Sequence, residues 1–199
     1  MLSFYNELAA SVVIDKQNNK LIQFDQSLTL AGVGRSAFVF KIKDTNKAIK
    51  VFFPQFNQIA QEEADIYNRI QHIDYYPTLY EAGPNYIVID YIEGHTLFEC
   101  LTLGIRISED HIKEVDLALS LAENEGLTPS DIHLRNIFLT SQEEIKIIDV
   151  ARFRQTKHYK QWEHLKRAFY RLYSISLFPK KIPAFILNLI AALYKKLYK

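Results

Sequence analysis

The sequence predicts an α+β protein with a strand-rich first half and a mainly helical second half. Two observations predict this class. Most of positions 1–91 consists of short β-branched and aromatic runs separated by turn residues, with one amphipathic segment at 57–72. Beyond Gly94, longer segments with helix-capping signals replace the short runs. The 199 residues are 48% hydrophobic and 24% charged, which is ordinary globular composition and enough for a buried core. We therefore expect two parts, residues 1–91 and 92–199.

The first part is expected to be mostly antiparallel strands. A short helix at 3–10 opens it, and isoleucines at helical spacing on a polar background predict one longer helix over 57–72. The turn at 44–47 closes a hairpin, and Pro54 ends its second strand. The predicted strands are Ser11–Ile14, Leu21–Phe24, Leu28–Ala31, Phe38–Lys43, Ala48–Phe53, Thr78–Glu81 and Tyr86–Tyr91.

The second part is expected to combine helices with one small hairpin. Ser108 is the expected N-cap of a helix that ends at Gly126, with His111 at its surface. The β-rich runs Ile137–Leu139 and Ile145–Ile148 predict the hairpin. The remaining residues are expected to be helical.

Three polar residues carry the strongest functional signal. Asp131 and Asn136 lie five positions apart in DIHLRN, and Asp149 follows thirteen positions later in IIDVARF. The predicted hairpin between them would return both segments to one place. Asn136 and Asp149 would then supply the hard oxygen ligands that Mg²⁺ prefers, and Asp131 a carboxylate that can accept a hydroxyl proton. The alternative is an ordinary loop followed by a strand end.

Upstream residues predict a site for phosphates. Gly32 and Gly34 in GVGRSAFV let a strand–turn–strand backbone approach a triphosphate, although such a motif alone is most often only a hairpin turn. Lys50 ends an apolar strand and is either an edge charge or a phosphate clamp, and a partly buried clamp needs a carboxylate partner. Glu63 on the following helix is the expected partner and Glu62 the alternative. In this order the fragments predict phosphoryl transfer from ATP.

These motifs resemble those of the protein-kinase-like superfamily over residues 28–153. The run VIDYIEG at 88–94 is similar to the family's hinge, with Ile89 as gatekeeper and backbone groups of Asp90 and Ile92 facing adenine. The resemblance implies a minimal two-lobed protein-kinase-like fold, with an antiparallel β-sheet N-lobe bearing one helix and a truncated, mainly α-helical C-lobe. The nearest likeness is to small bacterial Ser/Thr-kinase-like proteins and to minimal kinases of the RIO and lipopolysaccharide-kinase type.

The resemblance also implies roles for single residues, with ATP and Mg²⁺ as cofactors. It implies that Asp131 and Lys50 are catalytic, and that Asn136 and Asp149 are metal ligands. The residues that it implies in nucleotide binding are Gly32, Val33, Gly34, Val39, Ala48, Lys50, Glu63, Ile89, Asp90 and Ile92.

Three features depart from the family pattern. Positions 129–131 read PSD, without the arginine that would receive a phosphorylated activation loop. Positions 149–151 read DVA, and an alanine at a positive φ would cost about 1 kcal/mol, so this segment is expected to run differently. The fifty residues after Asp149 are too few for the full helical substrate platform.

The acceptor of the phosphoryl group is expected to be a Ser or Thr hydroxyl of a protein. A sugar, lipid or other small-molecule hydroxyl is the alternative, and His133 favours it, since small-molecule phosphotransferases often have histidine where protein kinases tend to have lysine. A nucleotide-binding pseudokinase that acts as a scaffold is a further alternative. The complete Lys-Glu-Asp-Asn-Asp set argues against the scaffold.

Charge is distributed unevenly, because twelve Lys or Arg and a single acid follow Asp149. The basic stretch 152–171 is expected either to recruit an anionic partner or to be a solvated surface that packs against acids. The apolar run 184–194 predicts a buried helix. An interfacial helix at a membrane surface, with three C-terminal lysines facing headgroups, is the alternative.

The sequence also predicts a cytoplasmic location. The single cysteine, Cys100, excludes an internal disulfide and fits a reducing compartment. The N-terminal residues lack a basic flank and a cleavage site, so no signal peptide is expected. No apolar run approaches the ~20 residues needed to span a bilayer.

Overall fold

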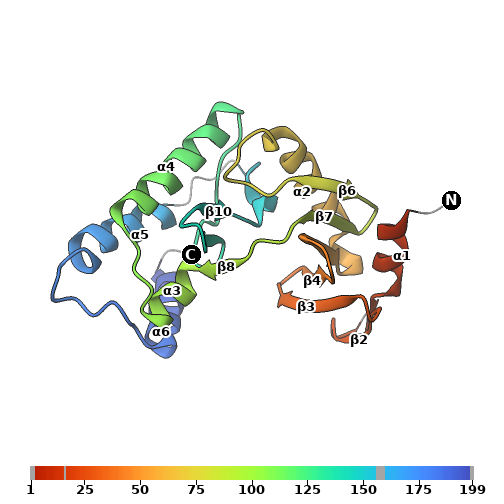
Figure 1. Ribbon diagram of the computed structural model, residues 1–199, viewed down its shortest axis with the longest axis horizontal. Coiled ribbons are helices and arrows are strands. Elements are labelled where there is room, and N and C mark those ends of the chain that lie inside the picture. The colour runs from red at the N-terminus through yellow and green to blue at the C-terminus, as the bar shows by residue number, and fades with distance from the viewer. Residues whose placement is uncertain (1–2, 16, 156–159, 198–199) are drawn as a thin grey trace. The chain divides into compact units, whose positions relative to one another are not determined.

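The computed structural model describes residues 3–15, 17–155 and 160–197 and shows a mixed α/β chain, with strands gathered early and helices later (Figure 1). The chain divides into two compact units. The first unit comprises Met1–Ile92 and Asp149–Arg154, and the second comprises Glu93–Ile148 and Gln155–Lys199. Each unit is described here by itself.

The first unit is built on a five-stranded antiparallel sheet with the strand order β3-β4-β5-β7-β6. Two further strands, β1 and β2, precede this sheet in the sequence and form a separate antiparallel pair. All seven predicted strands are confirmed, with ends displaced by no more than two residues. The strands are β1 (Val13–Ile14), β2 (Leu21–Gln23), β3 (Leu28–Val33), β4 (Ala37–Ile42), β5 (Lys47–Phe52), β6 (Leu79–Ala82) and β7 (Tyr86–Asp90).

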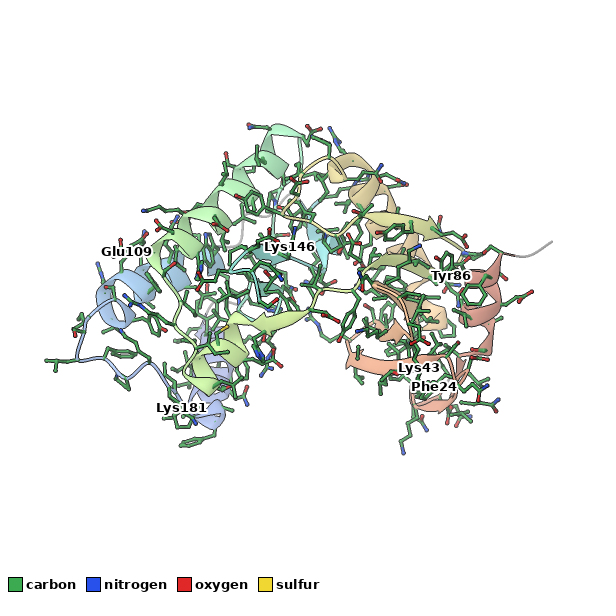
Figure 2. The ribbon with its side chains drawn as sticks, in the orientation of Figure 1. Phe24, Lys43, Tyr86, Glu109, Lys146 and Lys181 are labelled. Carbon is green, nitrogen blue, oxygen red and sulfur yellow. The ribbon has the colours of Figure 1, made fainter. Side chains whose placement is uncertain are left out.

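One face of this sheet holds the hydrophobic core under the first helix, α1 (Phe4–Ser11). Strand side chains alternate between faces, so Phe40 and its register partner Ile49 point to the same side. Both are fully buried and pack with Leu8 of α1. The side chain of Tyr86 lies beside α1 (Figure 2), and its hydroxyl donates to Glu81 Oε1 at 2.6 Å.

The opposite face of the sheet carries the residues expected to bind nucleotide. Val39 lies opposite Lys50 in the register, and Ala48 lies opposite Ile89. Because Ala48 and Lys50 are two positions apart on β5, all four share one face. The helix α2 (Asn57–Ile70), preceded by a 3₁₀ turn at Pro54–Phe56, packs against β5, β6 and β7 and confirms the helix predicted at 57–72.

The second unit contains a three-stranded sheet and the remaining helices. The hairpin of β9 (Ile137–Thr140) and β10 (Ile145–Ile147) confirms the prediction. A third strand, β8 (Gly94–Thr96), joins β9 and was not predicted. Gly94 approaches β9 so closely that a Cβ would lie 2.4 Å from the Leu139 carbonyl oxygen. The need for glycine at position 94 comes from this tertiary contact, so the local sequence did not indicate a strand there.

Capping boxes start two helices of the second unit, α3 (Leu97–Leu103) and α4 (Glu109–Asn124). The predicted N-cap Ser108 is confirmed, because its Oγ accepts the His111 N–H at 3.2 Å. The expectation that His111 lies at the surface is wrong. Its ring is buried, and Nδ1 accepts the Ser108 N–H at 3.2 Å to complete the box.

The C-terminal region is helical, as expected. It comprises α5 (Gln161–Ala168), a π-helical turn at Phe169–Tyr173 and α6 (Ala184–Leu197). The expectation that the apolar run 184–194 forms a buried helix is wrong, since no residue of α6 is buried. Across the described ranges, no helix combines the length and apolar character that a bilayer crossing requires.

Truncating the fully buried Phe40 ring should destabilise the first unit strongly. We expect Phe40→Ala to lower the free energy of unfolding by about 3–5 kcal/mol, because it removes buried apolar surface and leaves a cavity. Urea unfolding followed by circular dichroism measures the change. The matched control is Phe4→Ala on α1, whose ring is exposed and which should change stability by less than about 1 kcal/mol. Equal losses for both variants would contradict the assigned core.

Candidate functional site

The centre of the candidate site in the first unit is the ammonium group of Lys50. Lys50 lies on β5 and is buried. Its Nζ donates to both carboxylate oxygens of Glu63, at 2.8 and 2.7 Å, and to Oδ1 of Asp149 at 3.0 Å. One buried cation is therefore held between two carboxylates that come from α2 and from the segment after β10.

The helical period decides which of two neighbouring acids meets Lys50. Glu63 belongs to the buried stripe of α2, together with Ile66, Tyr67 and Ile70 at i+3, i+4 and i+7. Glu62 points away from this stripe and accepts a hydrogen bond from Gln58 at 3.0 Å. Of the two acids that the sequence left open, Glu63 makes the contact.

Burial and charge act in opposite directions on this cluster. Burial disfavours the charged form of Lys50, but attraction to Glu63 and Asp149 outweighs it and raises the pKa of the ammonium. Burial is the largest influence on Glu63 and raises the pKa of its carboxyl, with Lys50 acting the other way. The raised pKa of Lys50 therefore favours its charged form.

Asp149 fits the donor chemistry of a magnesium site. Its side chain is 44% exposed although Oδ1 contacts Lys50, and a carboxylate supplies the hard oxygen ligands that Mg²⁺ prefers. The backbone is left-handed, with φ 62° and ψ 59°, a conformation that aspartate tolerates better than most residues. Ala151 has no positive φ and lies in the 3₁₀ turn Val150–Arg152, so the segment avoids strain at the alanine, as the sequence predicted.

The segment after Asp149 is anchored on its own unit. Phe153 is fully buried and packs edge-on against the ring of Tyr76, with centroids 5.9 Å apart. Arg154 pairs with Asp65 of α2 at 3.4 Å. These contacts hold residues 149–154 against α2 and thereby keep the Asp149 carboxylate beside Lys50.

Tyr67 is a site residue that the sequence interpretation missed. It lies one turn after Glu63 on α2 and is completely buried. Burial, and then the carboxylates of Glu63 and Asp149, raise the pKa of its hydroxyl well above the ordinary value. The i+4 spacing from Glu63 on an otherwise apolar stripe was the available signal.

The glycine loop is the hairpin between β3 and β4. The Gly34 N–H donates to the Ala37 carbonyl at 2.9 Å and closes the turn, while Val33 is exposed. A Cβ at position 34 would lie 3.3 Å from the Ala37 oxygen, whereas one at Gly32 would make an ordinary 3.8 Å contact with Val39. The tight turn therefore explains Gly34, and packing alone does not require Gly32.

The expected hinge follows the end of β7. Ile89 is buried on the Lys50 face. The Asp90 carboxylate accepts the Thr78 N–H and the Tyr80 hydroxyl, both at 2.7 Å, so this side chain braces the sheet edge. Within the described part of the chain, no backbone carbonyl accepts the Ile92 N–H.

The second unit holds the loop that contains Asp131 and Asn136. Asp131 is left-handed, with φ 61°, and partly exposed. Asn136 is buried, and its Nδ2 donates to the Asp131 carbonyl at 3.3 Å. The Asn136 N–H donates to the His133 carbonyl, and the Ile148 N–H donates to the Asn136 carbonyl, both at 2.9 Å. The loop is thus closed on itself and tied to the residue that precedes Asp149.

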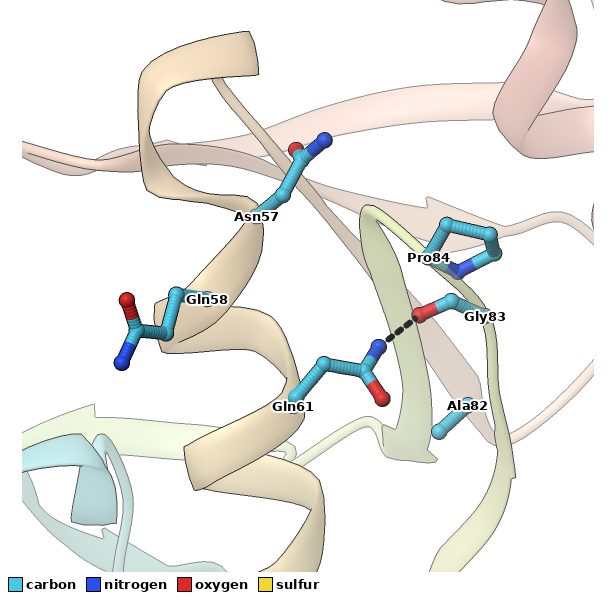
Figure 3. Close-up of a pocket in the computed structure, with 6 residues that line it drawn as sticks. All are labelled: Asn57, Gln58, Gln61, Ala82, Gly83 and Pro84. Carbon is cyan, nitrogen blue, oxygen red and sulfur yellow. Dashed lines mark hydrogen bonds between the residues drawn. The ribbon is translucent and has the colours of Figure 1, made fainter.

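A second surface feature, a pocket beside α2, has no ionisable side chain in its lining. Figure 3 shows a shallow pocket beside α2 in which Gln61 Nε2 donates to the Gly83 carbonyl at 2.7 Å. None of its lining residues is ionisable: Asn57, Gln58, Gln61, Ala82, Gly83 and Pro84. Among residues 3–15, 17–155 and 160–197, no three His, Cys, Asp or Glu side chains form a group that could hold a metal.

Two basic side chains of the stretch 152–171 are paired with acids, each within the unit to which it belongs. Arg154 pairs with Asp65, as above, and Lys166 pairs with Asp116 of α4 at 2.9 Å and with Glu163 at 3.0 Å. Lys157 lies outside the described residues. The alternative that the basic residues pack against acids therefore applies to Arg154 and Lys166.

Comparisons with known proteins give one consistent kind of relative. The chain is 46% identical over 200 residues to the Bacillus subtilis protein named "putative serine/threonine-protein kinase YrzF", covering 98% of this chain and 93% of that relative. A Clostridium acetobutylicum protein named "probable serine/threonine-protein kinase" is 29% identical over 135 residues, covering 59% and 20%. The 3-phosphoinositide-dependent protein kinase 1 of Arabidopsis thaliana is 30% identical over 123 residues, covering 57% and 24%. No protein-family model matches the chain.

The two adjacent acids of α2 offer a matched test of the buried ion pair. We expect Glu63→Gln to lower the free energy of unfolding by about 1–3 kcal/mol, because a charged hydrogen-bond acceptor of buried Lys50 is lost. Glu62→Gln, one position away, should change it by less than about 0.5 kcal/mol. Chemical denaturation of the full chain measures both. Equal stability of the two variants would show that the contact with Lys50 adds nothing to folding.

Proposed function

Because this chain belongs to the protein-kinase-like superfamily, we propose that it is an ATP- and Mg²⁺-dependent Ser/Thr protein kinase. The observation that carries the proposal is the buried Lys50 ammonium between Glu63 and Asp149. A buried lysine with a partner on a neighbouring helix and a second, half-exposed carboxylate beside it fits a clamp for the phosphates of a metal-bound nucleotide. The partly exposed carboxylate of Asp149 has the hard oxygen donors that suit a divalent cation.

Each chemical role falls to a named side chain. Lys50 would contact the phosphate oxygens, with Glu63 holding its ammonium in place. Asn136 and Asp149 would hold magnesium, which neutralises phosphate charge when bound. Asp131 would accept the proton of the acceptor hydroxyl as that oxygen bonds to the γ-phosphorus. The bond from the γ-phosphorus to the bridging oxygen breaks, and ADP leaves.

The adenine would be read by backbone groups. Backbone groups of Asp90 and Ile92 would face the adenine, and Val39, Ala48 and Ile89 share a sheet face with Lys50. Flat aromatic rings suit such an apolar surface with a few polar groups at its edge. A cytoplasmic location stays a prediction, for which the buried free thiol of Cys100 is the support.

The alternative acceptor is the hydroxyl of a sugar, a lipid or another small molecule. His133 favours it, since it stands two residues after Asp131 at a position where small-molecule phosphotransferases often have histidine. Its Nδ1 accepts the Arg135 N–H at 3.3 Å, so the ring helps to shape the catalytic loop.

Incubation with γ-labelled ATP and Mg²⁺, alone and with a cell lysate, separates these functions. Label on the protein itself or on lysate proteins supports the proposed protein kinase. Label confined to the metabolite or lipid fraction supports the small-molecule kinase. MgATP binding without transfer to any fraction leaves a pseudokinase and overturns the proposal.

The metal-ligand role of Asp149 predicts weaker nucleotide binding when its charge is removed. We expect Asp149→Asn to reduce MgATP affinity by about tenfold or more, because a charged oxygen ligand is lost while side-chain volume is kept. Calorimetric titration with MgATP measures this, and Asp44→Asn, at an exposed position in the turn between β4 and β5, is the control in the same unit. Equal MgATP affinity for the wild type and Asp149→Asn would remove Asp149 from the metal site.

The proton-acceptor role of Asp131 predicts a different pattern. Asp131→Asn should lower turnover by a factor of about 10²–10⁴ with little change in MgATP affinity, since general-base groups act on the chemical step. Steady-state transfer assays combined with calorimetry separate the two quantities. Asp110→Asn, an exposed acid at the start of α4, serves as the control. Turnover unaffected by Asp131→Asn would exclude this carboxylate from the mechanism.

A further inference from the structure

The C-terminal helix α6 presents a continuous apolar surface. Six of its apolar side chains are between 37% and 76% exposed, and we call them the α6 apolar face. At 3.6 residues per turn they occupy one side of the helix, over an arc of about 140°. The α6 apolar face comprises Phe185, Ile186, Leu189, Ile190, Leu193 and Leu197.

The side of α6 opposite the α6 apolar face contacts other elements of the second unit. Asn188 Oδ1 accepts a hydrogen bond from Arg135 at 2.9 Å, and the Tyr194 hydroxyl lies 2.9 Å from His164 Nδ1. Just before the helix, the Ile182 N–H donates to the Leu101 carbonyl at 2.8 Å. The helix is therefore fixed through polar groups, and its apolar face is left outward. Soluble proteins rarely leave so many neighbouring apolar side chains uncovered without an interaction partner.

The charge around this face selects an anionic partner. From His164 to Lys199 the sequence contains eight Lys or Arg and no Asp or Glu. Lys195 and Lys196 lie in the last turn of α6, and Lys181, labelled in Figure 2, lies just before its start. Their long stems can follow apolar surface while the ammonium groups reach outward. Positive charge thus frames the α6 apolar face at both ends.

The combination of apolar face and flanking lysines fits a lipid bilayer better than another polyanion. Nucleic acids present phosphates but no apolar surface that would cover isoleucine and leucine side chains. An anionic bilayer offers headgroup phosphates for lysines and acyl chains for the apolar residues. A helix of 14 residues is about 21 Å long, which is shorter than the ~30 Å hydrocarbon core, so it would lie in the interface rather than cross it.

We propose that α6 docks the protein on the surface of anionic phospholipid membranes, with the α6 apolar face in the headgroup–acyl boundary. This goes beyond the proposed phosphoryl transfer and does not depend on it. Leu177, in the segment before α6, is a further apolar side chain that is 95% exposed. A phosphotransferase held there would meet acceptors that are themselves at the membrane.

Cosedimentation of the full chain with lipid vesicles tests the docking. We expect binding to vesicles of phosphatidylcholine with roughly one third phosphatidylglycerol, little binding to phosphatidylcholine alone, and weaker binding as salt rises. Leu189→Glu with Leu193→Glu should reduce partitioning by about tenfold or more, since two charges enter the apolar face. The matched control is Leu117→Glu, a half-exposed leucine on α4, which should bind as the wild type does.

A second variant tests the charge component without touching the apolar face. Lys195→Gln with Lys196→Gln should weaken binding to anionic vesicles several-fold and reduce its dependence on salt. Circular dichroism confirms that each variant remains folded. The proposal is overturned if the wild type ignores anionic vesicles or if both double variants bind as the wild type does. It is also overturned if ultracentrifugation without lipid shows a dimer that Leu189→Glu with Leu193→Glu disperses, because the face then joins two copies.

Discussion

The buried ammonium of Lys50 is the interaction on which the organisation of the first unit depends. Its carboxylate partners, Glu63 and Asp149, come from a helix and from a segment 99 positions away in sequence. A buried lysine without partners would be costly, so Glu63 of α2 and Asp149 offset the cost of burying this charge. The ion cluster thereby couples the fold of this unit to the chemistry proposed for it.

The two faces of the β3–β7 sheet divide the tasks between them. The face under α1 is filled with aromatic and aliphatic side chains such as Phe40 and Ile49, and it supplies the stability. The other face carries Lys50 and the apolar residues proposed to contact adenine. Strand alternation is the physical reason, because it sends neighbouring residues of β5 to opposite sides. A one-residue slip in register would exchange core and site.

The helix α6 is apolar, and yet none of its residues is buried. Its polar side contacts Arg135 and His164, while its apolar side is uncovered. Hydrophobicity alone predicted burial, since apolar helices are usually inside. In the structure, hydrogen bonds on the polar side hold the helix, and the exposed apolar side fits the membrane docking proposed above.

The sequence by itself determined the seven strands of the first unit, the small hairpin and the Ser108 cap, because these follow from short-range periodicity and capping chemistry. The spacing of Asp131, Asn136 and Asp149, and the place of Lys50 on an apolar strand, identified them as residues of interest. The helical period of α2 accounts for Glu63 rather than Glu62 once the buried side of that helix is known. The tertiary structure decided the contact of Asp149 with Lys50, the strand β8 at Gly94 and the exposure of α6. Each of these depends on what a residue contacts far away in sequence, and no local pattern encodes that.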